Sequence, residues 1–196
     1  GMGVIHRNLQ IKKQCEHVLK VKKNRLKVGA AIGTSQTELV RAKNLIDSGT
    51  DMLVIDTAHG HSYNVLQMLN KIKKFSNKIT ICVGNIATGD AAKLLYNSGA
   101  DILKVGIGPG SICTTRMVAG IGVPQITALL NVKKAMNKKK IKIISDGGIK
   151  FSGDIIKAIA AGADAIMMGS IFAGTDESPG KIFKINNKFY KLYRGM

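Results

Sequence analysis

The 196-residue sequence contains no tryptophan, and its few phenylalanines and tyrosines make up only 5% of the chain. Its three cysteines, Cys15, Cys82 and Cys113, are far apart and show no CxxC spacing. An odd number of widely spaced cysteines argues against a disulfide framework and against a structural zinc site. No apolar run is long enough to span a bilayer, and the first residues carry no signal-peptide pattern. We therefore expect a soluble cytoplasmic protein without a membrane partner.

Acidic residues are also scarce, with 12 Asp and Glu against 30 Lys and Arg, which gives a formal net charge of +18. Such a charge is typical of proteins that bind nucleic acid. Here, however, the lysines are spread through predicted helices and their ends, as in "KIKKF" and "NKKKIK", and no aromatic residues are interleaved with them. We expect no specific nucleic-acid partner, and a cationic surface that attracts anionic substrates.

A pattern of helix, glycine, aspartate and strand occurs three times. It is seen in "LIDSGTDMLVID" (45–56), "LLYNSGADILKVG" (94–106) and "IAAGADAIMMGS" (159–170). Gly49, Gly99 and Gly162 suit the left-handed conformation that ends a helix. The short apolar runs that follow are typical of strands buried on both faces of a parallel sheet.

The complete chain extends this alternation and predicts an α/β fold. The number of units favours a (β/α)8 TIM barrel of parallel strands over an open sheet. Only seven strands are found, so we expect an incomplete barrel without its first strand. Ser35 and Glu38 have the spacing of a capping box at one helix start. Strands are predicted at 3–5, 27–33, 52–57, 79–84, 102–107, 141–146 and 165–169, and helices at about 36–47, 62–75, 89–97, 127–138 and 153–161.

The last part of the chain departs from the pattern. The stretch "FKINNKFYKL" predicts two short strands around an Asn-Asn turn. We therefore expect residues 1–196 to form a single domain, a partial barrel with a β-hairpin excursion at about 181–193.

Active sites of such barrels lie at the carboxyl ends of the strands. Loops after the last two strands of a barrel often bind phosphate through glycine N–H groups. The pairs Gly147-Gly148 and Gly169-Ser170 stand at those places, and Asp146 could accept hydrogen bonds from ribose hydroxyls. The alternative is that these glycines only close the turns.

The connection "GIGPGSICTTR" (106–116) begins the longest loop of the chain. Long loops in compact domains are usually functional. Cys113 lies there among backbone N–H groups, which favour a thiolate, so we predict a nucleophile. Cys82 in "TICVG" is expected to be an inert core residue, and Cys15 to lie in an amphipathic helix. His59 and His61 are too few for a metal site.

Three long segments resemble the IMP dehydrogenase family: "GIGPGSICTTRMVAGIGVPQITA", "SDGGIKFSGDIIKAIAAGADAIMMGS" and "YRGM". The similarity extends over essentially the full chain. GMP reductase, which uses NADPH to deaminate GMP to IMP, has a similar cysteine loop and is the alternative. The segments "VAGIGVPQITA", "AHGHS" and "YRGM" resemble the dehydrogenase more closely.

The resemblance implies an NAD-dependent oxidation of IMP to XMP, the rate-limiting step toward guanine nucleotides, in a cytoplasmic homotetramer. By this resemblance Cys113 attacks the purine and Thr115 assists hydrolysis of the thioimidate. The residues implied to bind IMP are Ser111, Asn85, Asp146, Gly147, Gly148, Gly169, Ser170, Tyr193, Arg194, Gly195 and Met196. Those implied to contact NAD are Asp56, Thr57, Ala58, Gly106, Ile107 and Gly108, and backbone carbonyls of Gly108, Gly110 and Cys113 are implied to bind K+.

The sequence also departs from this family. The family's paired-CBS regulatory domain follows the helix that ends here near "VLKVKK", but "NRLKVGAAIG" comes next, so we expect no CBS domain. The opening strand, with its IMP contacts, and the C-terminal flap, whose arginine acts as a base, are expected to be absent. Two other hypotheses are a phosphosugar enzyme with Lys104 as a Schiff-base amine, and a non-catalytic nucleotide or nucleic-acid binder.

Overall fold

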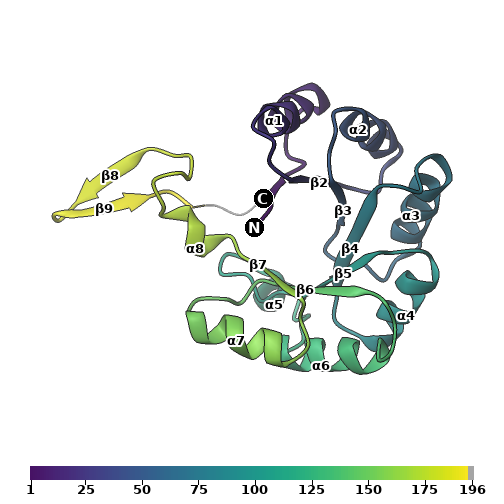
Figure 1. Cartoon of the computed structure of the whole chain (residues 1–196). Helices are drawn as coiled ribbons and strands as arrows, with labels where there is room; N and C mark the ends of the chain where they lie inside the picture. Colours follow the sequence, from purple (N-terminus) through teal and green to yellow (C-terminus); the bar gives the residue numbers. More distant parts are fainter. Residues whose placement is uncertain (194–196) are drawn as a thin grey trace.

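The computed structural model describes residues 1–193, and its main feature is a curved sheet of seven parallel strands (Figure 1). The strands follow one another around the sheet in chain order, from β1 to β7, and helices line its outer side. Within residues 1–193, β1 pairs only with β2 and β7 only with β6, so the sheet stays open. The predicted α/β fold, an incomplete TIM barrel, is confirmed.

The element bounds agree closely with the predicted ranges, except that the short helices α5 and α8 were not predicted. The strands are β1 (Gly3–Ile5), β2 (Val28–Ile32), β3 (Met52–Asp56), β4 (Thr80–Ile86), β5 (Ile102–Val105), β6 (Lys142–Asp146), β7 (Ala165–Met167), β8 (Ile182–Ile185) and β9 (Lys188–Lys191). The helices are α1 (Ile11–Lys23), α2 (Gln36–Asp47), α3 (Tyr63–Phe75), α4 (Gly89–Asn97), α5 (Thr115–Val118), α6 (Gln125–Ala135), α7 (Ser152–Ala160) and α8 (Ser170–Ala173). No helix among them is long and apolar enough to cross a membrane.

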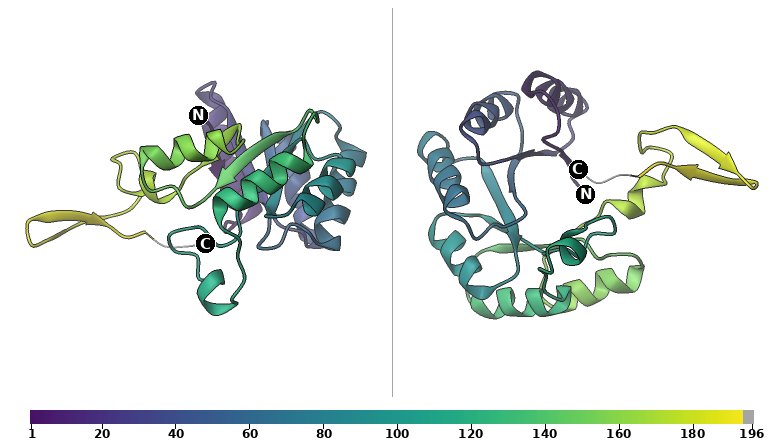
Figure 2. Two further views of the ribbon diagram at one scale, coloured as in Figure 1. Left: turned by 90° about the horizontal axis from the view of Figure 1, so that it is seen from below. Right: turned by 180° about the vertical axis from the view of Figure 1, so that it is seen from behind.

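The strands β8 and β9 form the expected antiparallel hairpin. Asn186 and Asn187 have φ angles of 48° and 60°, the left-handed conformation that a tight two-residue hairpin turn requires. Figure 2 shows this hairpin, drawn in yellow, projecting away from the sheet.

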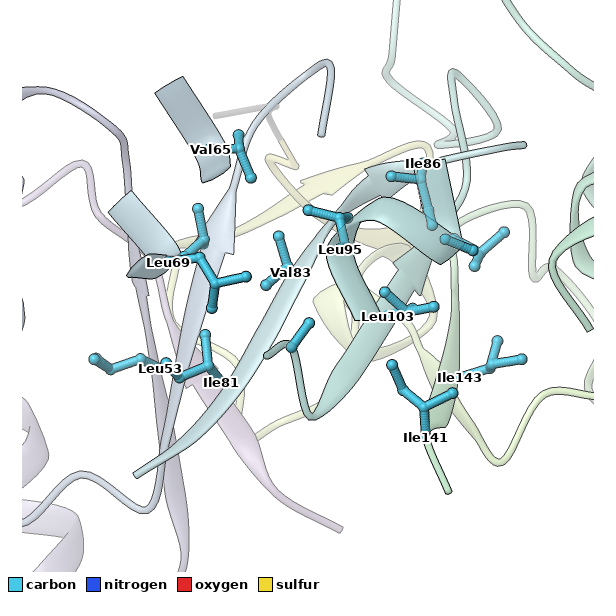
Figure 3. Close-up of a cluster of buried hydrophobic side chains, with 14 of the residues drawn as sticks. Leu53, Val65, Leu69, Ile81, Val83, Ile86, Leu95, Leu103, Ile141 and Ile143 are labelled. Atoms are coloured by element: carbon cyan, nitrogen blue, oxygen red, sulfur yellow. The ribbon is translucent and has the colours of Figure 1, made fainter. Parts of the chain in front are cut away.

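The outward face of the sheet packs against the helices and forms the main core (Figure 3). Alternate strand residues such as Leu53, Ile81 and Leu103 are fully buried there, as period-two alternation requires. Helix α3 buries its predicted apolar face in this core through Val65, Met68, Leu69 and Ile72. Leu66 is partly buried and packs against the same core.

The inward face of the sheet is lined by apolar residues near its middle. Ala31, Met52, Val54 and Cys82 form a second buried cluster there. Two residues further along β3 the same face presents Asp56, because side chains alternate between the faces of a strand. The inward face thus changes from apolar to polar toward the carboxyl ends of the strands.

The repeated glycine and aspartate have a structural role in closing each helix–strand turn. Gly49, Gly99 and Gly162 have φ angles of 87°, 94° and 108°, as predicted for residues that end a helix. The aspartate two residues later accepts a hydrogen bond from a backbone N–H of the neighbouring strand and one from a lysine. These bonds join Asp51 to Val28 and Lys22, Asp101 to Ile81 and Lys73, and Asp164 to Ile143 and Lys142.

The predicted capping box at Ser35 is wrong. The Ser35 side chain makes no capping bond to α2, and its hydroxyl lies 2.9 Å from that of Thr37. Glu38 instead accepts from the backbone N–H of Gly33 and from Arg41. Because Arg41 offers Glu38 a charged partner and Gly33 an adjacent donor, the carboxylate turns toward the sheet.

We expect the repeated aspartates to make the fold sensitive to acid. Burial raises the pKa of Asp164, but hydrogen bonds from Lys142 and from the Ile143 N–H outweigh burial and lower the pKa below 3.8. The pKa of Asp51 is lowered in the same way by hydrogen bonds from Lys22 and from the Val28 N–H. The stability they contribute is therefore complete above that ordinary value and is lost as the pH falls through the lowered pKa. Each of the variants Asp51→Asn and Asp164→Asn should cost about 1 kcal/mol of unfolding free energy at pH 7.

The measurement is the urea midpoint of each variant between neutral pH and pH 2. The difference from the parent protein should shrink as the pH falls below about 4. The control is Asp90→Asn, because the Asp90 side chain is 88% exposed and lies 3.9 Å from Lys93. A difference that stays constant down to pH 2 would contradict the argument.

Candidate active site

A buried cluster of polar side chains lies on the inward face at the carboxyl ends of β3 to β6. At its centre, Lys104 of β5 is 3% exposed. Its Nζ donates to Asp56 Oδ1 at 2.8 Å, to Asp146 Oδ2 at 2.6 Å and to Asn85 Oδ1. The amide of Asn85 donates in turn to Asp146 Oδ2 at 2.9 Å and to the Gly106 carbonyl at 2.8 Å.

The register of the sheet explains why these residues meet. Asp56 pairs with Gly84, and Gly84 pairs with Lys104, so the two charged residues share one face and one level of the sheet. The register then shifts between Gly84 and Ile86, which leaves Asn85 without a partner residue in β5. Gly84 is needed because a Cβ there would lie 2.5 Å from the Lys104 carbonyl oxygen.

The charge state of Lys104 bears on the hypothesis of a phosphosugar enzyme in which this lysine is a Schiff-base amine. Burial lowers the pKa of this lysine, but the carboxylates of Asp146 and Asp56 outweigh burial and raise it above 10.5. A Schiff-base lysine needs a lowered pKa, because only the neutral amine is nucleophilic. The surroundings of Lys104 thus argue against the phosphosugar hypothesis.

Cys113 lies exposed on the loop that follows β5. Its Sγ and the Oγ1 of Thr115 are 3.2 Å apart in a hydrogen bond. Bonds from the side chain and the backbone of Thr115 lower the pKa of the Cys113 thiol below 9.0, against a small opposing effect of burial, and Arg116 adds to the lowering. Cys82 is the opposite case, since burial raises its pKa to about 12 despite the nearby Lys104. Cys113 is the thiol suited to nucleophilic chemistry.

The cysteine loop is more ordered than the sequence indicated, because it contains the helix α5. Arg116, within α5, donates to the carbonyls of Ile107 at 3.3 Å and Val123 at 2.6 Å and so joins the two ends of the loop. Gln125 at the start of α6 donates to the Val105 carbonyl and to Ser145. Figure 2 shows the loop with its short helix extending beyond the edge of the sheet.

The cysteine loop meets the turn after β6 through closely packed glycines. A Cβ on Gly106 would lie 2.2 Å from the Asp146 carbonyl oxygen, and one on Gly147 would lie 3.1 Å from the Gly110 nitrogen. Gly147 and Gly148 have φ angles of 84° and 76°, so their conformation also favours glycine. The structure therefore brings the predicted nucleophile loop and the predicted phosphate turn together.

The other predicted site residues are spread around the same edge of the sheet. Gly169, in the turn after β7, lies close to Tyr193 at the end of the hairpin, since a Cβ on Gly169 would lie 2.8 Å from Tyr193 Oη. Ser170 is the first residue of α8. Thr57 donates its hydroxyl to the Gly84 carbonyl, and Ala58 and Ser111 are exposed. Arg194, Gly195 and Met196 lie outside the described residues.

Two contributors to this region were missed by the sequence analysis. Lys104 was considered only as an amine nucleophile, although a charged residue within the apolar run "DILKVG" signals a buried partner of opposite charge. The hydrogen bond between Gln125 and Ser145 could not be predicted from the sequence, because neither the residue types nor their spacing distinguish these two residues from surface residues.

The thiol geometry predicts how Cys113 reacts with iodoacetamide. Alkylation of Cys113 in the absence of nucleotides should reach half its maximal rate below pH 9.0, since only the thiolate reacts. Thr115→Val should move this midpoint to higher pH, because it removes the hydroxyl that stabilises the thiolate. Thr114→Val is the matched control, and the rate is followed by mass spectrometry of the Cys113 peptide. An unmoved midpoint in Thr115→Val would contradict the assigned hydrogen bond.

Comparison with known proteins places this chain in a family. The family described as "IMP dehydrogenase / GMP reductase domain" matches residues 1–196. The chain belongs to this family.

Relatives named inosine-5'-monophosphate dehydrogenase share more than half of their aligned residues with the chain. The chain is 54% identical to the one from Rhizobium tropici over 92% of its own length and 36% of the relative's. It is 51% identical to the relative from Chlorobaculum parvum over 98% of its own length and 39% of the relative's. It is 58% identical to the relative from Staphylococcus aureus over 88% of its own length and 35% of the relative's. The chain thus spans little more than a third of the curated relatives that it matches.

Proposed function

We propose that the protein containing this chain oxidises IMP to XMP with NAD+ and uses Cys113 as the nucleophile. The observation that carries the proposal is the thiol of Cys113, which is activated by Thr115 on a loop that packs against the Asp146–Gly148 turn. The names of the relatives, at 51–58% identity, support the same reaction.

The substrate would lie across the carboxyl ends of the strands. Asp146 bonds Lys104 and Asn85 through Oδ2, and its Oδ1 accepts no bond from a described residue, so it is available to ribose hydroxyls. The N–H groups of the glycine turns would bind the phosphate. The residues proposed to hold IMP are Asn85, Ser111, Asp146, Gly147, Gly148, Gly169, Ser170 and Tyr193, together with Arg194, Gly195 and Met196 outside the described residues.

In the reaction, Cys113 Sγ forms a bond to C2 of the purine as a thiolate. The C2–H bond then breaks with its electron pair, and NAD+ supplies the acceptor for that hydride. Water attacks C2 of the resulting thioimidate, releases one proton to the surrounding solvent and displaces the thiolate, which yields XMP. The Thr115 hydroxyl, 3.2 Å from the sulfur, is placed to bond this water and then the leaving thiolate.

The residues proposed to contact NAD lie after β3 and β5, at the carboxyl edge of the sheet. The Asp56 side chain is 35% exposed, and only its Oδ1 is used by Lys104. Thr57 and Ala58 follow Asp56 directly after β3, and Gly106, Ile107 and Gly108 follow β5 at the same edge of the sheet. The carboxylate would bind hydroxyl groups of the dinucleotide, and the backbone of the glycines allows close approach.

The proposal includes a potassium ion bound by carbonyl oxygens of the cysteine loop. Among the described residues, the Gly108 and Cys113 carbonyls accept no hydrogen bond, and the Gly110 carbonyl accepts one, from the Cys113 N–H. Each oxygen therefore keeps a lone pair for a hard cation. The ion would hold the loop in the conformation that presents Cys113.

GMP reductase is the second candidate, because the matched family includes it. In that reaction the same Cys113 would attack GMP, and NADPH would reduce the adduct after ammonia leaves. The named relatives favour the dehydrogenase.

We also propose that residues 1–196 form one partial catalytic domain with the hairpin as an excursion. The short link of residues 24–27 between α1 and β2 supports a domain without an inserted CBS domain at that point. The family resemblance supports a cytoplasmic homotetramer for the full-length protein.

The deciding experiment measures NADH formation from IMP and NAD+ by the full-length protein, with and without K+. We expect NADH and XMP in equal amounts, at a rate that K+ increases. NADPH consumption with GMP, without NADH formation from IMP, would establish the reductase instead.

A further inference from the structure

The buried ammonium of Lys104 has no role in the reaction described so far. It bonds residues that we assign to different subsites, with Asp56 proposed for the cofactor and Asn85 and Asp146 for the substrate. We propose that Lys104 is a positioning residue that fixes Asp56 and Asp146 relative to each other and so couples cofactor binding to substrate binding. This inference rests on the proposed function.

In each of the two aspartates, one carboxylate oxygen accepts a hydrogen bond from Lys104 and the other does not. Asp56 uses Oδ1 and Asp146 uses Oδ2 for Lys104, and the other oxygen of each accepts no bond from the described residues. The aspartate side chains are 35% and 23% exposed, whereas that of Lys104 is 4% exposed. The lysine thus lies behind the two carboxylates, and their free oxygens are available to ligands.

The position of Lys104 distinguishes it from the structural lysines of the fold. Lys22, Lys73 and Lys142 each pair with one aspartate that precedes a strand, at the amino ends of the sheet. Lys104 pairs with two aspartates that end strands, at the opposite edge. Removing a buried lysine from such a cluster leaves uncompensated like charges, which then separate or recruit a proton or cation.

None of the groups that face Lys104 could replace its positive charge. The titratable groups that face it are Asp56 from β3, Cys82 from β4 and Asp146 from β6, and Asn85 adds a neutral amide. Cys82 remains a neutral thiol, since its pKa is about 12. Within the described residues, Lys104 therefore supplies the positive charge that holds both carboxylates in place.

The test compares Lys104→Met and Lys104→Arg in the full-length protein, with Lys73→Met as the matched ion-pair control. Calorimetry gives the dissociation constants of IMP and NAD+, and steady-state kinetics give both KM values and kcat. We expect Lys104→Met to raise the dissociation constants and KM values of both ligands at least about tenfold. Lys104→Arg should restore them to within about threefold, because it keeps the charge. Lys73→Met should leave them unchanged.

Further readouts separate positioning from a general loss of structure. Alkylation of Cys113 without nucleotides should proceed at the parent rate in Lys104→Met. If Lys104→Met does not fold, the charge-balanced variant Lys104→Met/Asp56→Asn replaces it, and its KM for IMP should exceed that of Asp56→Asn at least about tenfold.

Two results would overturn the inference. One is binding of both ligands in Lys104→Met within twofold of the parent, and the other is a loss of Cys113 alkylation and thermal stability that arginine does not restore. A parent protein that binds IMP but forms no NADH would refute the proposed function alone, because weakened IMP binding in Lys104→Met would still support positioning. A parent protein that does not bind IMP would refute both.

Discussion

Replacing Cys113 by alanine should lower NADH formation from IMP about a thousandfold or more in the full-length protein. In the proposed reaction this thiol forms and later releases the covalent bond to C2, and the described part of the chain offers no second thiol at that edge of the sheet. Cys82 is buried and has a raised pKa, and Cys15 lies half-buried in α1. Alanine leaves the backbone of the loop unchanged, so IMP binding should persist.

The matched control for this prediction is Cys15→Ala, which removes a thiol of similar size far from the site. It should retain the parent rate. The rate is followed by NADH absorbance, and IMP binding by calorimetry on the same samples. Turnover in Cys113→Ala within tenfold of the parent would exclude Cys113 as the nucleophile.

Gly106→Ala should both destabilise the protein and abolish activity. Gly106 has a φ angle of 149°, and a Cβ there would lie 2.2 Å from the Asp146 carbonyl oxygen. This neighbour is backbone, so relief requires the ends of β5 and β6 to separate. We expect a loss of about 3 kcal/mol or more in unfolding free energy. The same separation would move the cysteine loop away from Asp146.

The control for Gly106→Ala is Gly153→Ala in α7. A Cβ on Gly153 would meet nothing within 4 Å, and alanine favours a helix over glycine by about 0.5–1 kcal/mol. Gly153→Ala should therefore be neutral or slightly stabilising in urea unfolding and should keep full activity. Equal stability of the two variants would show that the ends of β5 and β6 are not as close as the structure places them.

The fold was largely predictable because its signals are local and repeated. The helix–glycine–aspartate–strand pattern of 45–56, 94–106 and 159–170 identifies each turn, and the apolar runs identify buried parallel strands. What local pattern could not supply is the choice between several possible partners of one side chain. Glu38 bonds Gly33 and Arg41 rather than Ser35, because the fold places these donors within its reach.

The site was predictable in part for the same reason. The glycine turns and Cys113 stand directly after strands, so their place at the carboxyl edge follows from the strand prediction. The bonds of Lys104 depend on the register of four strands and on the shift between Gly84 and Ile86. The contact between Gly106 and Asp146 similarly depends on how two loops pack, which sequence spacing does not encode.

The most direct test of Cys113 as the covalent nucleophile is mass spectrometry of the protein quenched during turnover of IMP and NAD+. We expect the peptide that contains Cys113 to carry the XMP thioimidate, only when both IMP and NAD+ are present, with no adduct on Cys15 or Cys82. Sustained NADH formation with an unmodified Cys113, or with the adduct on another residue, would contradict the proposed chemistry.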